Sequence, residues 1–386
     1  MFDVIVIGSG LTGAVIAERI ATVLNKKVLI IEKREHIAGN CYDYKDETGI
    51  LVHKYGPHIF HTDNKKVFDY LSSFTNWDIY HHNVLAFIDG KKVPIPFNLN
   101  SIDILFPKEL AENLTKKLLN KFSYGEKVPI LNLLVENDSD LKFLAKYVYD
   151  NIFLNYTVKQ WGLKPEEIDP EVTGRVPIFI GRDNRYFNDR YQCLPRQGYT
   201  KMFEKILANQ NIKLLMKANF KEIMNLDFIN KKIFFMGNQF KGKLVYTGKI
   251  DELFDFKFGE LPYRSLNMCF EKHEVEFFQE TTSVNYPNNY DFTRITEFKH
   301  LHPIKTQKTV ILKEFPQKHI HNINEPYYPF FTKDAKQKYE MYLKFSKKFK
   351  NLVLAGRLAD YKYYDMDDAI ENALRVFERI FLKNEN

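Results

Sequence analysis

Three glycines near the N-terminus have the spacing of a nucleotide-binding turn. Gly8, Gly10 and Gly13 stand in the order G-x-G-x-x-G within the stretch DVIVIGSGLTGAVIAERIATVL. The first glycine permits a tight turn, the second lets a pyrophosphate approach the backbone, and the third lets a helix pack closely on a strand. The free N–H groups at the start of the following helix bind phosphate oxygens. This stretch therefore predicts a cradle for the diphosphate of a dinucleotide.

An acidic residue stands where such a cradle needs one. Glu32 ends a second apolar run, KKVLIIEK, about 20 residues beyond the glycines. A carboxylate there binds ribose hydroxyls and disfavours a 2′-phosphate. The neighbouring cations Lys33 and Arg34 leave open whether a 2′-phosphate is disfavoured. Strand, glycine turn, helix, strand and acid together predict the start of a parallel α/β sheet. A secretion signal is disfavoured, because the stretch lacks a basic leader and carries Asp3.

A second segment near the C-terminus completes the pattern. The stretch NLVLAGRLADYKYYDMDDAIENALRVFERIF has the pattern of a strand ending at Gly356–Arg357, a polar segment and a helix. Acidic residues occupy the expected first helical turn, at Asp365, Asp367 and Asp368. The glycines alone fit NAD as well as FAD. A C-terminal return to the cofactor is typical of FAD folds, so we expect FAD.

The middle of the chain changes its periodicity. Residues 81–97 alternate like two strands around Asp89–Gly90, a hairpin signal, and residues 101–161 have a helical period. The predicted fold class is α/β, with a Rossmann-like FAD-binding domain, an inserted helical domain and an antiparallel β-sheet domain. We expect the FAD-binding domain to comprise residues 1–78, 195–250 and 345–386, the helical domain residues 98–165, and the sheet and substrate domain residues 79–97, 166–194 and 251–344.

Composition narrows the partners. The 386 residues are 45% hydrophobic and 27% charged, and 56 Lys and Arg against 49 Asp and Glu give a net charge of +7. The basic residues are scattered, so we expect no nucleic-acid partner, and mild positive charge suits a small anionic substrate. No apolar run approaches the roughly 20 residues of a membrane span. Cys41, Cys193 and Cys269 lie far apart, which predicts no metal site and a reducing compartment, the cytoplasm.

Several segments, in order along essentially the whole chain, resemble those of the UDP-galactopyranose mutases. They read EKREHIAGN, HKYGPHIFHT, YTVKQWG, GRVP, DNRYFNDRYQ, LVYTGKID, LPYRSLNM, EPYYP and GRLADYKYYDMDDAI. The resemblance implies an isomerase that uses reduced FAD to interconvert the pyranose and furanose forms of a nucleotide-diphosphate sugar through a flavin N5–sugar adduct. The default substrate is UDP-galactopyranose, for cell-surface polysaccharide biosynthesis. It also implies a homodimer and a reductant such as NAD(P)H.

The resemblance also assigns roles to residues. Two arginines grip the substrate diphosphate, as guanidinium groups do, and these are Arg175 and Arg264. His58 lies beside the flavin ring. The uridine side is formed by Asn83, Tyr156 and Trp161, and a polar ring around the sugar diphosphate by Tyr186, Tyr328, Tyr363 and Asp365. The cofactor-binding set is Gly8, Gly10, Gly13, Glu32, Lys33, Gly39, Asn40, Arg357 and Met366.

The chain departs from the family pattern on segments expected at the substrate side. Phe179 replaces an arginine, Arg182 is new nearby, and Ala38 replaces a glycine; Cys193, Arg196 and Gln197 also differ. Our hypothesis is that Phe179 lies against the sugar and favours a 6-deoxy substrate, because an apolar ring leaves an extra hydroxyl unpaired. Alternatively, Phe179 points away and Arg182 replaces the lost arginine. Other open alternatives are N-acetyl or pentose sugars, a deoxythymidine carrier, an FAD oxidoreductase, and a sugar-nucleotide-binding protein without catalysis.

Overall fold

A parallel five-stranded sheet forms the part of the fold that carries the glycine turn. The computed structural model describes residues 2–162 and 177–382. The sheet has the order β12-β2-β1-β16-β22, and all its pairs are parallel. Its strands come from both ends and the middle of the chain: β1 (Val4–Ile7), β2 (Val28–Ile31), β12 (Ile212–Leu215), β16 (Lys243–Tyr246) and β22 (Leu352–Leu354). Every residue of β1 and β2 is buried, as expected for a sheet covered on both faces.

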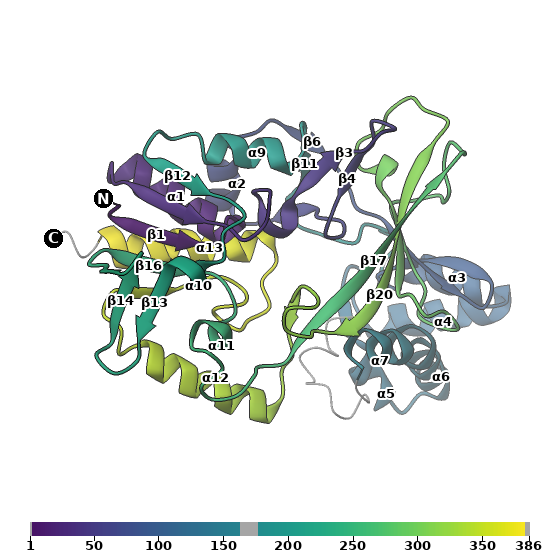
Figure 1. The fold of residues 1–386 in the computed structure, drawn as a ribbon. Helices are drawn as coiled ribbons and strands as arrows, with labels where there is room; N and C mark the ends of the chain where they lie inside the picture. Colours follow the sequence, from purple (N-terminus) through teal and green to yellow (C-terminus); the bar gives the residue numbers. More distant parts are fainter. Residues whose placement is uncertain (1, 163–176, 383–386) are drawn as a thin grey trace.

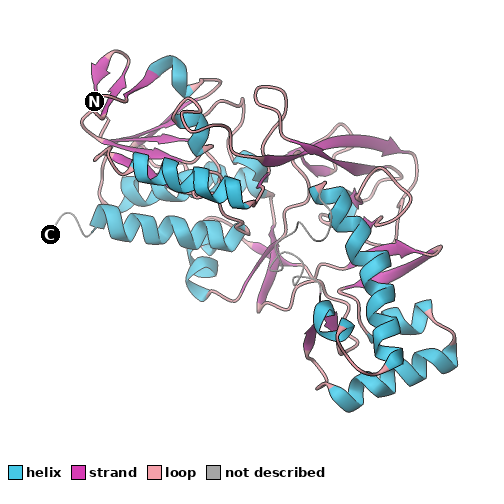
Figure 2. Ribbon diagram, turned by 90° about the horizontal axis from the view of Figure 1, so that it is seen from below, coloured by secondary structure: helices cyan, strands magenta, loops and turns pink. Residues whose placement is uncertain are grey.

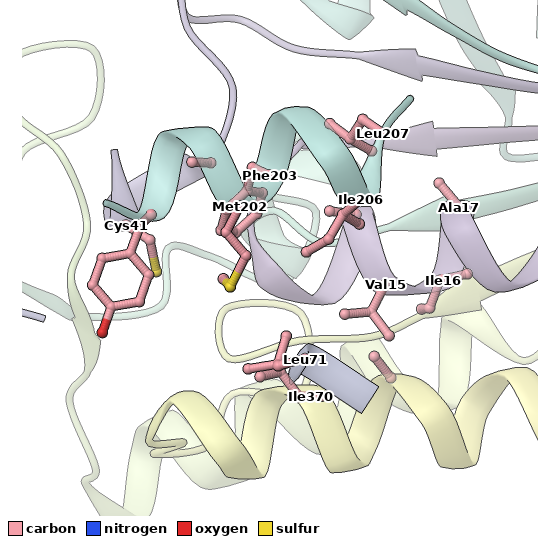
Figure 3. Close-up of a cluster of buried hydrophobic side chains, with 14 of the residues drawn as sticks. Val15, Ile16, Ala17, Cys41, Leu71, Met202, Phe203, Ile206, Leu207 and Ile370 are labelled. Atoms are coloured by element: carbon pink, nitrogen blue, oxygen red, sulfur yellow. The ribbon is translucent and has the colours of Figure 1, made fainter. Parts of the chain in front are cut away.

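Helices cover one face of this sheet. They are α1 (Leu11–Val23), α9 (Tyr199–Ile206) and α13 (Met366–Phe377). Figure 3 shows their apolar side chains meeting, with Val15 of α1, Phe203 of α9 and Ile370 of α13 in one buried cluster. The contact of α1 with α13 joins the N-terminal and C-terminal segments. The predicted return of the C-terminus to the glycine turn is therefore confirmed.

The other face carries a small antiparallel sheet and further helices. These elements are α10 (Phe220–Ile223), β13 (Met224–Asp227), β14 (Lys232–Phe235), β15 (Asn238–Gln239), α11 (Ile250–Leu253) and α12 (Lys333–Ser346). Ala335 and Tyr342 of α12 pack in the same core as Ile5 and Leu244 of the large sheet. Thus α12 lies against the cofactor sheet, although we expected residues before 345 in the substrate domain. The division into domains stays a prediction.

A second, seven-stranded sheet crosses the molecule (Figure 1). Its order is β21-β17-β20-β19-β18-β7-β8, and its strands are β7 (Val84–Ile88), β8 (Lys91–Ile95), β17 (Tyr263–His273), β18 (Ser283–Asn285), β19 (Arg294–Glu297), β20 (Thr309–Lys318) and β21 (Tyr328–Pro329). The hairpin at Asp89–Gly90 is confirmed, with φ angles of 48° and 77° in the turn. The sheet is antiparallel except for the parallel pair β7–β18, which the alternating sequence pattern did not indicate.

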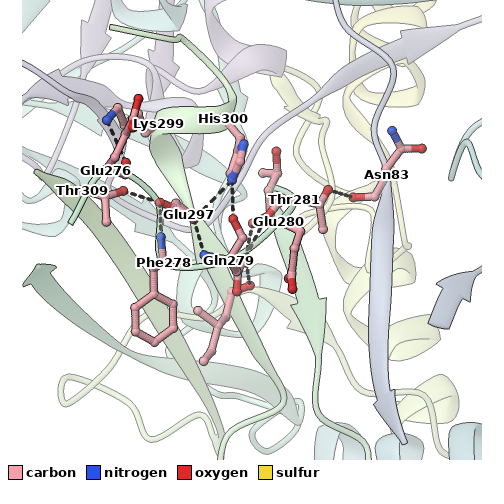
Figure 4. A network of polar contacts seen from close by, with 12 residues as sticks. Asn83, Glu276, Phe278, Gln279, Glu280, Thr281, Glu297, Lys299, His300 and Thr309 are labelled. Carbon is pink, nitrogen blue, oxygen red and sulfur yellow. Dashed lines mark hydrogen bonds and ion pairs between the residues drawn. The ribbon is translucent and has the colours of Figure 1, made fainter. Parts of the chain in front are cut away.

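A buried carboxylate holds the C-terminal end of β19 in place. Glu297 accepts hydrogen bonds from the backbone N–H groups of Phe278 and Gln279, both at 2.9 Å, and from the Thr309 hydroxyl at 2.5 Å (Figure 4). His300 lies 3.2 Å from the same carboxylate. Glu297 is fully buried, so these donors replace the water that it loses. The network holds β19 against β20 and the loop after β17.

The helices of the middle segment gather at the end of the molecule remote from both termini (Figures 1 and 2). They are α3 (Leu99–Leu105), α4 (Lys108–Lys121), α5 (Ile130–Leu134), α6 (Ser139–Val148), the π-helix η2 (Tyr149–Leu154) and α7 (Asn155–Trp161). Buried residues of these helices share a core with the β7–β8 hairpin. The helical stretch is interrupted where β9 (Lys127–Pro129) pairs with β10 (Pro177–Phe179). No helix in the described ranges has the length and apolar character needed to cross a membrane.

Shorter elements link the glycine turn to the second sheet. They are η1 (Gly39–Cys41), β3 (Asp43–Lys45), β4 (Leu51–His53), β5 (Phe60–Thr62), α2 (Lys65–Ser72), β6 (Trp77–Ile79) and β11 (Tyr191–Pro195), with η4 (Phe298–His300) and η5 (Glu378–Leu382) elsewhere. Together the elements confirm the predicted α/β class with a Rossmann-like sheet.

Candidate active site

A cavity of about 1090 Å³ extends from the carboxyl edge of the five-stranded sheet to the second sheet and the end of η2. It brings together most of the residues that the sequence suggested. Those lining it are Gly8, Gly10, Gly13, Glu32, Lys33, Gly39, Asn40, His58, Tyr156, Tyr186, Tyr328, Arg357, Tyr363, Asp365 and Met366. Arg264 and Asn83 are not among its lining residues. Arg175 lies outside the described residues, as does the side chain of Trp161 at the end of α7.

The glycine turn can pack this closely only because its glycines lack side chains. A Cβ on Gly13 would lie 2.1 Å from the carbonyl oxygen of Gly8, and a Cβ on Gly39 would lie 2.7 Å from the Cα of Gly10. Helix α1 starts directly after Gly10, so its free N–H groups open at this turn. The cradle therefore fits a dinucleotide diphosphate. Ala38 adopts φ 73°, the left-handed conformation that the glycine it replaces would adopt without strain.

Glu32 is fixed against the same turn. Its Oε2 accepts hydrogen bonds from the N–H and the hydroxyl of Ser9, at 2.9 and 2.8 Å. Its Oε1 accepts the N–H of Arg34 at 2.9 Å. The side chains of Lys33 and Arg34 pair with Glu325, with N···O distances of 3.1 and 2.9 Å. Because both cations already have a carboxylate partner, the site favours a ribose without a 2′-phosphate.

The C-terminal segment reaches the cavity through a tight turn. The N–H of Gly356 donates to Asp360 Oδ2 at 3.1 Å. The guanidinium of Arg357 lies over the ring of Tyr328, 5.1 Å from its centre. Asp365 precedes the first turn of α13, and its N–H donates to Asp368 at 3.1 Å. The positive end of the α13 dipole thus opens into the cavity, as expected for an FAD fold.

His58 is held as a neutral ring. Its Nδ1 lies 2.9 Å from the carbonyl oxygen of Gly56, so Nδ1 carries the proton and Nε2 is an acceptor. Burial lowers the pKa of His58 to about 4. Its backbone N–H donates to His53 Nδ1 at 3.0 Å. His61 also lines the cavity, where it contacts Asp189 at 3.1 Å and stacks on Phe187.

The tyrosines form a cluster of hydroxyl donors opposite the cofactor cradle. The rings of Tyr328 and Tyr363 are nearly parallel, with centres 5.7 Å apart. Burial raises the pKa values of Tyr156, Tyr186 and Tyr363 above the usual value for tyrosine. Their hydroxyls therefore stay protonated and can donate hydrogen bonds to an anionic ligand.

The structure adds an arginine that sequence reasoning missed. Arg294 of β19 lines the cavity and binds Glu314 of β20 through two bonds, Nε at 2.9 Å and Nη2 at 2.8 Å. Burial opposes its charge, but the Glu314 carboxylate outweighs this and raises the Arg294 pKa further. Among the described residues no partner engages Nη1. The two residues stand directly opposite in the β19–β20 register, which no local motif reveals.

Comparison with known proteins identifies the family. Residues 151–363 match the model of UDP-galactopyranose mutase, and residues 6–74 match that of the NAD(P)-binding Rossmann-like domain. The UDP-galactopyranose mutase of Mycoplasma genitalium is 37% identical over 98% of this chain and 95% of its own length. This chain belongs to the UDP-galactopyranose mutase family. It is therefore an isomerase-type enzyme, and the resemblance drawn from its motifs is confirmed.

One curated relative is named for a different nucleotide sugar. The dTDP-fucopyranose mutase of Escherichia coli is 34% identical over 100% of this chain and 99% of its own. A crystal structure of reduced UDP-galactopyranose mutase shares the fold, with a TM-score of 0.72 at 15% identity, covering 99% of this chain and 94% of that one.

Five of the six departures from the family pattern lie outside the lining of the cavity, and the sixth, Ala38, lines it at the glycine cradle. None of Phe179, Arg182, Cys193, Arg196 and Gln197 is among its lining residues. The N–H of Phe179 in β10 donates to the carbonyl of Phe97, while Arg182 pairs with Asp103 and Arg196 with Asp78, at 2.6 and 2.8 Å. Cys193 is buried in β11. The structure thus places Phe179 and Arg182 outside the lining of the cavity, and the hypothesis that Phe179 lies against the sugar stays a prediction.

Arg264 lies next to the cavity rather than in its lining. It belongs to β17, and its Nη2 lies 3.5 Å from the carbonyl oxygen of Lys159 near the end of α7. Its guanidinium also approaches Gly162, and burial lowers its pKa. Asn83 is exposed, and its carbonyl accepts the Thr281 hydroxyl (Figure 4). The roles assigned to these two residues rest on the resemblance alone.

Proposed function

We propose that this chain is an FAD-dependent mutase that interconverts the pyranose and furanose forms of a nucleotide-diphosphate sugar. The observation that supports this most is the single cavity that joins the glycine cradle to the Arg294 and tyrosine cluster. A dinucleotide bound at Gly8–Gly13 and a sugar diphosphate held at Arg294 would share this space. When bound in its reduced form, the flavin supplies the nucleophile for the anomeric carbon of the sugar.

The residues of the cradle would hold the cofactor in fixed orientation. The glycine turn and the start of α1 bind the diphosphate, and Glu32 binds ribose hydroxyls. His58 offers an unprotonated Nε2 at neutral pH. We propose that it accepts one hydrogen bond at the flavin edge. The start of α13, beside Met366, would favour negative charge on the reduced ring.

The opposite cluster would hold the substrate and its leaving group. The Nη1 group of Arg294 can donate to the diphosphate while Glu314 fixes the guanidinium plane. The hydroxyls of Tyr328 and Tyr363 can donate to phosphate or sugar oxygens. As the anomeric bond breaks, negative charge grows on the diphosphate, and preorganised donors stabilise it most at that point. Arg175 and Arg264 are proposed as further phosphate ligands, and Asn83, Tyr156 and Trp161 as the uridine side.

We propose UDP-galactopyranose as the substrate. Five of the six family departures lie outside the lining of the cavity, and Ala38 lines it at the cofactor cradle, so the described residues give no reason for a changed sugar. The Escherichia coli relative makes dTDP-fucopyranose the second candidate. We also propose NAD(P)H as reductant, a homodimer in solution, and the cytoplasm as location. The three cysteines, none in a disulfide, suit a reducing compartment.

The test is turnover by protein whose cofactor has been identified. Denatured protein should release FAD, and dithionite-reduced protein should convert UDP-galactopyranose to its furanose form, resolved by chromatography. A parallel reaction should contain dTDP-fucopyranose. Reductant should act catalytically. Consumption of one NAD(P)H per product would indicate an oxidoreductase instead. Substrate binding without turnover, in fully FAD-loaded reduced protein, would indicate a binding protein.

A further inference from the structure

The loop between β20 and β21, residues 319–327, passes over the cofactor end of the cavity. We call it the strap. Its shape is set by Asn324, whose Oδ1 accepts the N–H of Ile320 at 2.9 Å and whose Nδ2 donates to the Lys318 carbonyl at 3.0 Å. His319 Nδ1 lies 3.0 Å from the same Oδ1. The strap residues line the cavity, so this ordered turn forms part of its wall.

Two sets of polar contacts hold the strap against the five-stranded sheet. Glu325 pairs with Lys33 and Arg34, which directly follow Glu32 after β2. At the other attachment, Lys249 follows β16 and is only 5% exposed. Its Nζ lies 3.1 Å from His319 Nε2 and 3.3 Å from His321 Nδ1. The strap is therefore held at the carboxyl edge of two strands of the sheet.

The Glu325 attachment has a rigid anchor. The guanidinium of Arg34 also donates to Asn40 Oδ1 at 3.0 Å and lies over the ring of Tyr55, 4.2 Å from its centre. Burial disfavours the Glu325 charge, but Arg34 and Lys33 outweigh this and lower the pKa of Glu325 to about 2. Arg34 would stay in place without Glu325. Loss of the pair would release the Glu325 end of the strap, while Lys249 would still hold the other end.

The strap leads directly to a substrate-facing tyrosine. Only Pro326 and Tyr327 separate Glu325 from Tyr328. Proline restricts the backbone, and Tyr327 is 6% exposed, with its N–H donating to the Arg264 carbonyl at 2.9 Å. Glu325 and Tyr328 are therefore joined by a short segment with restricted backbone freedom.

We propose that Glu325 is a positioning residue that fixes Tyr328 from the cofactor side of the cavity. The ion pair of Glu325 with Lys33 and Arg34 couples the segment that binds the ribose to the tyrosine pair that faces the substrate. The role of Tyr328 in substrate binding rests on the proposed function. The strap's attachment does not, and it can be measured separately.

The first measurement is hydrogen–deuterium exchange of residues 319–328 in FAD-loaded protein. Glu325→Gln removes the charge and keeps the shape, and the control, Glu204→Gln, breaks an exposed pair with Lys201 on α9. We expect exchange in the strap to be about 10-fold faster in Glu325→Gln and unchanged in the control, since a charged hydrogen bond is worth at least that factor. Unchanged exchange in Glu325→Gln would overturn the proposal, whether or not the protein is a mutase.

The second measurement is a double-mutant cycle on turnover. Glu325→Gln should lower kcat/KM about 10-fold at saturating FAD, and Tyr328→Phe should lower it too. If Glu325 acts through Tyr328, the double variant should lose little more than Tyr328→Phe alone. Fully additive losses would overturn the proposal, because they would mean that Glu325 acts elsewhere.

Discussion

Replacing Arg294 tests the assignment that the structure adds to the sequence. Its guanidinium lines the cavity near the tyrosines, as that of Arg357 does. Two of its nitrogens are used by Glu314, and Nη1 is left for a ligand. Arg294→Lys keeps the charge but cannot reproduce the bidentate pair and the third contact together. Arg294→Met removes the positive charge and all of these hydrogen bonds.

The expected loss has two parts that can be separated. Removing one preorganised donor from a developing charge costs about 2–4 kcal/mol of transition-state stabilisation, or about 10²–10³ in kcat. Arg294→Met also leaves the Glu314 carboxylate unpaired, and its side chain is only 4% exposed. Breaking a buried pair in this way costs about 3–5 kcal/mol of folding stability. Some loss of activity in this variant would therefore reflect unfolding.

A double variant removes that ambiguity. Arg294→Met with Glu314→Gln leaves no unpaired charge, so its urea unfolding midpoint should return most of the way to that of wild type. Its kcat, measured in dithionite-reduced, FAD-loaded protein, should stay about 10²–10³ lower. The reasoning is refuted if the double variant regains near-normal kcat, because the arginine would then serve only to balance Glu314.

Three further predictions follow from the cavity and its walls. Gly13→Ala should abolish flavin absorbance in the purified protein, because its Cβ would lie 2.1 Å from the Gly8 carbonyl; a normal flavin spectrum would contradict the cradle. The pKa of His58 in the folded protein is lowered to about 4, so its neutral form favours folding above about pH 6.5, and this contribution is lost as the pH falls towards 4. The urea unfolding midpoint of His58→Asn should therefore depend less on pH between 6.5 and 4 than that of wild type. An equal pH dependence in the two proteins would contradict this. Phe179→Arg should leave the ranking of UDP-galactopyranose and dTDP-fucopyranose by kcat/KM unchanged, and a reversed ranking would show that Phe179 reaches the sugar.

The parts of the fold predicted from the sequence are those encoded over short distances. The glycine turn and its helix lie within one short segment, and Glu32 follows on the next strand. The hairpin at Asp89–Gly90 needs two residues that tolerate positive φ. The C-terminal strand and helix were predicted because Gly356 and the acidic first turn of α13 mark their limits. Each signal depends on local backbone physics.

What the sequence did not reveal depends on pairing between distant segments. Arg294 meets Glu314 through the pairing register of β19 and β20. A shift of that register by one residue would turn the side chains to the other face of the sheet. The position of Phe179 outside the cavity lining was not evident for a similar reason, because a motif position does not tell which way a strand faces. Its place follows from the pairing of β10 with β9, and no local pattern indicates that pairing.

The π-helix between α6 and α7 explains how the helical part contributes to the cavity. Ile152 and Phe153 of η2 and Tyr156 and Thr157 of α7 all line it. A π-turn adds a residue to the helical repeat and rotates the side chains that follow, and such turns often occur at functional sites. No residue type marks a π-turn in a sequence. Because these four side chains reach the cavity while Phe179 does not, selectivity for nucleotide and sugar should depend on them rather than on the family departures.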